Sequence, residues 1–141
     1  MNCRCSASDQ HFRQDFEAGL VEPESFDHRA HLRLAYVYLC ESDPEAAYLG
    51  MKAAIQGLLK CNGIDPSKYH ETLTRAWILA VRHFMEKSDG SDSADALIEQ
   101  FPQMLDSRIM LSHYSAELLF SDSARAGFVE PDKDAIPRYP P

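Results

Sequence analysis

The fold is decided by residues 26–39, which read FDHRAHLRLAYVYL. After Arg33 this stretch predicts a helix that is apolar on nearly every side, and such a helix lies in the centre of a bundle, not on its surface. His28 and His31 are three residues apart and therefore lie roughly 60° apart around the helix axis. They fall on the side of the apolar stripe. Two imidazoles are thus expected to point into the interior.

Two further histidines have a similar setting. His70 opens a periodic run in which spacings of three and four residues reach Leu73 and Trp77 on an apolar face. His113 lies in the segment 111–115, with Glu117 four residues further on. We therefore expect four imidazoles from three segments to converge inside one bundle.

Length, composition and charge limit the class of protein. The chain has 141 residues, enough for one domain with a substantial core, and 45% of them are hydrophobic. The net charge of −8 and the lack of a basic stripe exclude a nucleic-acid partner. No stretch reads as a signal peptide or a membrane span, which predicts a cytoplasmic protein without a membrane partner. The four cysteines form no disulfide framework and are read as reduced thiols.

Capping residues and apolar periodicity predict an all-α protein, a compact bundle of five to seven helices with an extended proline-rich C-terminal tail. Residues 1–8 are expected to be a flexible tail, 9–132 the helical domain and 133–141 the C-terminal tail. Ser8 or Asp9 is expected to cap the first helix, and Asp43 with Pro44 to start the third. The second helix is expected to be capped by Ser25 or Asp27 and to end around 41–43, and the third to run from 44 to the Asn62-Gly63 pair. The other predicted helices are about 9–19, 67–87, 94–101, 107–111 and 115–126.

Three strings of this sequence are familiar as a set: FDHRAHLRLA at 26–35, YHETLTRAW at 69–77 and HYS at 113–115. With the FVEPD string at 128–132 they resemble a family of short bacterial all-helical proteins. The resemblance covers about residues 12–132. It implies the helical fold but carries over no activity and no site residues.

The histidines predict a metal centre. Neutral imidazole binds iron, copper, nickel and zinc, and a pair three residues apart on one helix is a spacing used in helical metal sites. We expect a divalent transition metal, with iron preferred over zinc, copper or nickel because Trp and Tyr flank the histidines. Tyr114 and Glu117 are the candidate catalytic residues of this small metalloenzyme, which would act on a small-molecule substrate or ligand. The predicted ligands are His28, His31, His70 and His113.

Other interpretations stay open. The imidazoles can instead form a metal-free network in which His28 bonds a backbone carbonyl, His70 bonds Tyr114 and His113 bonds Thr74. A further alternative is a site to which only some of the histidines belong. Two non-enzymatic functions also stay open. One is a sensor or carrier of a metal or small ligand, with a homodimer as an option, and the other is an interaction protein with structural histidines.

Overall fold

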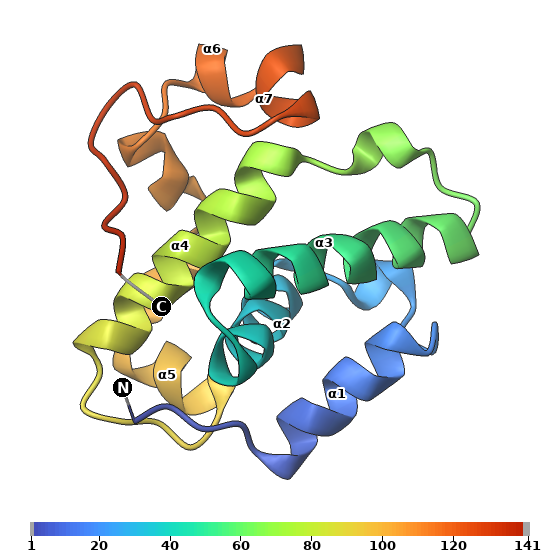
Figure 1. Ribbon diagram of the computed structural model, residues 1–141, viewed down its shortest axis with the longest axis vertical. Helices are drawn as coiled ribbons and strands as arrows, with labels where there is room; N and C mark the ends of the chain where they lie inside the picture. The colour runs from blue at the N-terminus through green and yellow to red at the C-terminus, as the bar shows by residue number, and fades with distance from the viewer. Residues whose placement is uncertain (1, 140–141) are drawn as a thin grey trace.

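The computed structural model describes residues 2–139 and confirms a compact all-α fold (Figure 1). No β-strand is present among these residues, and an isolated parallel bridge pairs Cys3 with Ser91. Short 3₁₀ segments connect the helices at Pro23–Ser25, Pro66–Lys68, Pro102–Leu105 and Ser107–Ser112. The helices are α1 (Ala7–Glu17), α2 (His28–Glu41), α3 (Pro44–Cys61), α4 (Glu71–Lys87), α5 (Ala94–Gln100), α6 (Ala116–Leu119) and α7 (Asp122–Ala126).

Helix α2 is the central helix, as predicted. It packs against α1, α3, α4 and α5, and Figure 1 shows it behind the crossing of α3 and α4. Asp27 caps it by accepting a hydrogen bond from the amide of Ala30. Of the eight residues 32–39, Arg33 is partly exposed and the other seven are buried: Leu32, Leu34, Ala35, Tyr36, Val37, Tyr38 and Leu39. This explains the near absence of a polar face after Arg33.

The predicted start of α3 is confirmed, whereas that of α1 is corrected. Asp43 accepts from the amide of Ala46 and is followed by proline in the first turn, so α3 begins where the sequence predicts. Helix α1 is capped by Ser6 and not by Ser8 or Asp9. Asp9 stands three residues after that cap and completes a capping box.

Asp9 also joins three helices. Its buried carboxylate accepts from Nε of Arg33 at 2.9 Å and from the backbone amide of Ala94 at 2.9 Å. These bonds connect α1 to α2 and to the start of α5. A buried carboxylate needs such partners, because an unpaired one is strongly destabilising.

The C-terminal third of the chain lies along one side of α4, where Figure 1 shows the orange and red segments. The helix predicted at 115–126 is broken into α6 and α7, because Ser121 caps a new helix by accepting from the amide of Ala124. Beyond Ala126, Thr72 of α4 holds the chain: its hydroxyl donates to the carbonyl of Gly127 and accepts from the amide of Val129.

Within residues 2–139, no helix combines the length and the apolar character that crossing a membrane requires. The cytoplasmic location and the division of the chain at residues 8 and 132 stay predictions. Asn2 and Arg4, which fall in the predicted N-terminal tail, form backbone hydrogen bonds with Ser91.

The central position of α2 leads to a stability prediction. Leu34→Ala removes a fully buried side chain, and we expect it to lower the free energy of unfolding by about 2–5 kcal/mol, because it leaves a cavity. Urea denaturation measures this change. The matched control is Leu49→Ala on α3, where the side chain is 55% exposed; its effect should stay within about 0.5 kcal/mol. Equal effects of the two substitutions would contradict the central position of α2.

Candidate functional site

A cavity of about 250 Å³ lies between the start of α2, the first half of α4 and the C-terminal third of the chain. We call it the histidine pocket, because His28 and His31 both line it. Trp77 of α4, which is almost completely buried, forms part of its wall. The full lining is His28, His31, Leu73, Trp77, Ser107, Arg108, Leu111, Leu119 and Phe120.

His31 has a buried nitrogen without a partner. Its Nε2 is shielded from solvent and has no hydrogen-bond partner. Its ring lies 5.6 Å from that of Phe26, centroid to centroid. Burial, and secondarily the electrostatic effect of nearby His28, lowers the pKa of His31 to about 4. At neutral pH the ring is therefore uncharged, with one N–H donor and one acceptor nitrogen.

His28 is held by the backbone of a distant segment. Its Nε2 donates to the carbonyl of Met104 at 2.8 Å. A carbonyl can only accept, which places a proton on Nε2. The rings of His28 and Trp77 pack edge to face, with 4.7 Å between their centroids. One of the three bonds of the metal-free network, that of His28 to a backbone carbonyl, is thus formed.

His70 caps α4 instead of opening it. The predicted helix 67–87 begins later, at Glu71, because the chain at His70 is extended and its Nδ1 accepts from the amide of Leu73 at 3.1 Å. Its Nε2 donates to the carbonyl of Leu119 at 2.8 Å. A ring that donates from one nitrogen and accepts at the other must be a neutral imidazole. Burial lowers the pKa of His70, in agreement with that state.

His113 lies under the C-terminal segment. Its Nδ1 donates to the carbonyl of Asp134 at 2.7 Å. Near it, the pKa of His83 is lowered mainly by burial and then by the positive charge of Lys87. His83 hydrogen-bonds the hydroxyl of Tyr139 at 2.9 Å, and the two rings stack. The two other expected bonds are replaced by different partners. His70 binds Leu119 and Leu73 instead of Tyr114. His113 binds Asp134, while Thr74 donates to the backbone carbonyl of His70.

The predicted metal-binding function is wrong. Among residues 2–139, no group of three or more His, Cys, Asp or Glu side chains is arranged to hold a metal ion. Three of the four expected ligands donate to separate backbone carbonyls, at Met104, Leu119 and Asp134. No common metal centre is therefore formed by the four imidazoles, those of His28, His31, His70 and His113. The prediction of a small metalloenzyme built on them is wrong.

The two candidate catalytic residues lie outside the histidine pocket. Tyr114 is fully buried, and its hydroxyl donates to the carbonyl of Val129 at 2.7 Å. Burial raises the pKa of Tyr114 to about 12. Glu117 is exposed in the first turn of α6. Their catalytic role stays a prediction.

Part of the pocket escaped the sequence prediction. Ser107 and Arg108 come from a 3₁₀ segment, and Phe120 follows the short helix α6. Their spacing matches no helical or strand period, so periodicity gives no signal for them. Phe120 is 60% exposed although aromatic.

Comparison of the chain with protein-family models, with curated proteins and with solved structures finds no match.

The neutral state of His31 leads to a pH prediction. Below pH 6.5 the unfolded chain binds a proton at this position, whereas the folded protein does so only near pH 4. The contribution of the neutral His31 ring to the free energy of unfolding is therefore fully present above pH 6.5 and is lost as the pH drops towards 4. At about 1.4 kcal/mol for each pH unit, His31 accounts for about 3 kcal/mol of this loss. Urea midpoints of the His31→Leu variant should fall less over this window than those of the parent.

The control for this prediction is His11→Leu, because the imidazole of His11 is 74% exposed on α1. It should keep the pH dependence of the parent. A His31→Leu variant whose stability falls with pH as steeply as the parent's would contradict the buried, neutral state of this residue.

The two bonds of His70 can be separated by substitution. Asparagine can cap α4 but is too short to reach the carbonyl of Leu119, so His70→Asn should cost about 1–3 kcal/mol in the free energy of unfolding. His70→Ala loses both bonds and should cost about 1 kcal/mol more. Chemical denaturation of both variants measures the difference. Equal stability of His70→Asn and the parent would show that the bond to Leu119 does not stabilise the fold.

Proposed function

We propose that the protein binds a small, largely apolar molecule carrying one hydroxyl group, a phenol or a cyclic alcohol, in the histidine pocket and without a metal. The observation that carries the proposal is the unpartnered Nε2 of His31. A buried polar atom left without a hydrogen bond costs about 1–3 kcal/mol. A ligand hydroxyl removes this cost when the pocket wall shifts to expose Nε2, which is shielded from solvent in the present arrangement. A hydroxyl both donates and accepts and therefore suits either tautomer of the ring.

The walls favour an apolar ligand. Leucines 73, 111 and 119 line the pocket together with Trp77 and Phe120. Ligand sites typically combine such apolar and aromatic walls with a few polar groups. The cavity of about 250 Å³ is somewhat smaller than the roughly 300–1,000 Å³ of sites for drug-sized ligands. A single substituted ring is the matching size.

Charge favours a neutral ligand. Arg108, the arginine of the lining, already pairs with both oxygens of Asp106, at 3.0 and 3.3 Å. Its charge is thereby compensated, and it is strongly exposed. His31 is uncharged at neutral pH, since its pKa is about 4. An anionic ligand would gain little from either group, whereas a neutral hydroxyl needs no counter-charge.

A matched pair of probes tests this function. 4-Fluorophenol and 4-fluorotoluene have similar shapes, and only the first carries a hydroxyl. Fluorine NMR titration gives the ratio of the affinity for the phenol to the affinity for the toluene. This ratio should be about two- to tenfold larger for the parent than for His31→Leu, which is the effect of one hydrogen bond. His11→Leu serves as the control and should bind as the parent does.

Circular dichroism shows whether each variant is folded before titration. Equal relative affinities for the two probes in the parent and in a folded His31→Leu variant would contradict the role of His31. Failure of the parent to bind either probe would contradict the proposed function as a whole.

A further inference from the structure

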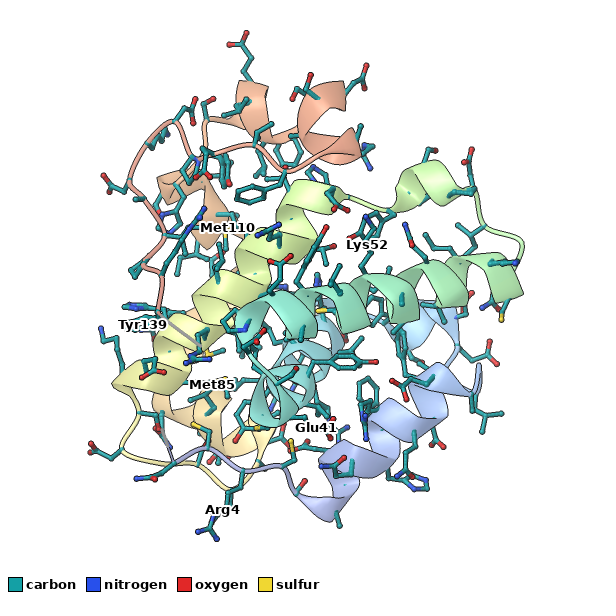
Figure 2. The ribbon with its side chains drawn as sticks, in the orientation of Figure 1. Arg4, Glu41, Lys52, Met85, Met110 and Tyr139 are labelled. Atoms are coloured by element: carbon teal, nitrogen blue, oxygen red, sulfur yellow. The ribbon has the colours of Figure 1, made fainter. Side chains whose placement is uncertain are left out.

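Three of the four cysteines gather where the N-terminal segment passes the end of α2. Cys3 and Cys5 flank Arg4 in the extended chain before α1, and Cys40 lies in the last turn of α2. Figure 2 shows Arg4 and Glu41, the last residue of α2, in the same lower part of the molecule. All three thiols are partly buried, whereas Cys61 is exposed at the end of α3.

The N-terminal segment is fixed by backbone bonds. The amide of Arg4 donates to the carbonyl of Ser91 at 2.8 Å, and the carbonyl of Arg4 accepts from the hydroxyl of Tyr36 at 2.6 Å. Residues at alternate positions of an extended chain share one face. Cys3 and Cys5 therefore both face the protein, while Arg4 is exposed.

The two inward thiols reach different helices. Cys3 lies against the carbonyl of Met85 in α4, with 3.8 Å from sulfur to oxygen. Cys5 lies against the carbonyl of Val37 in α2 at 3.9 Å. Cys40 follows Val37 by three residues and so shares its face of the helix. Cys5 and Cys40 therefore lie on the same side of α2, close enough for each thiol to change the pKa of the other. Cys5, and not Cys3, is the partner of Cys40.

We propose that Cys5 and Cys40 form a reversible disulfide, a covalent modification site oxidised by low-molecular-weight disulfides such as glutathione disulfide. The thiolate of Cys5 attacks one sulfur of glutathione disulfide and releases one glutathione thiolate. Cys40 then loses its proton and attacks the Cys5 sulfur of the mixed disulfide, which releases the second glutathione. Two protein thiols are oxidised, and one glutathione disulfide is reduced to two glutathione molecules.

The roles of the two thiols follow from their effect on each other. The neighbouring Cys40 thiol lowers the pKa of Cys5, and the neighbouring Cys5 raises the pKa of Cys40. Cys5 is therefore the thiol that attacks first, because the thiolate is the nucleophile. The resulting bond links the N-terminal segment to α2 and closes a loop that contains α1.

The test uses Cys3→Ser/Cys61→Ser, a full-length protein that keeps only the proposed pair. After exposure to glutathione disulfide, its intact mass should be lower by two hydrogens, and peptide mapping should find residue 5 linked to residue 40. Dithiothreitol should restore the original mass. The control adds Cys40→Ser, which removes the second thiol and should leave glutathione attached to Cys5.

Two results would overturn the proposal. The first is a stable glutathione adduct, or an unchanged mass, in folded Cys3→Ser/Cys61→Ser. The second is a bond between Cys3 and Cys40 as the main product in the parent protein. Circular dichroism before oxidation establishes that the variants are folded, and a link that forms in urea but not in buffer likewise contradicts the proposed contact.

Discussion

The structure depends on hydrogen bonds from imidazole rings to backbone carbonyls of the C-terminal third. His28, at the start of α2, holds Met104, and His70, at the start of α4, holds Leu119. His113 holds Asp134 within that third itself. Residues 102–139 form only short helices and irregular segments, which bury too little surface to be stable alone. Their carbonyls need donors, and these side chains supply them.

The same bonds determine what the histidines can do. An imidazole that donates to one carbonyl and accepts from an amide, as His70 does, has no nitrogen left for a ligand. His31 differs from the others, because its Nε2 is buried without a partner. The C-terminal third that the other rings hold in place supplies Ser107, Arg108 and Phe120 to the pocket beside it. The other histidines therefore hold in place part of the lining of the pocket that His31 also lines.

Local signals predicted much of the fold and part of the pocket. Asp43 with Pro44 located α3, and helical spacing placed His28 and His31 on one side together with the core. The sequence could not show the second bond of His70, from Nε2 to a carbonyl 49 residues away, which fixes the tautomer whose Nδ1 accepts at the start of α4. Histidine is an uncommon cap, so the apolar period appeared to run through it. Ser107 and Arg108 lie in a 3₁₀ segment whose spacing follows no helical or strand period, so periodicity could not place them in the pocket.

The most direct test of the imidazole–carbonyl bonds is the position of the ring protons, which long-range ¹H–¹⁵N NMR of labelled histidines reports. The structure requires a neutral His70 with its proton on Nε2 at pH 7, because Nδ1 accepts from the amide of Leu73. It also requires protons on Nε2 of His28 and on Nδ1 of His113. A His70 ring that is charged, or that carries its proton on Nδ1, would contradict the account.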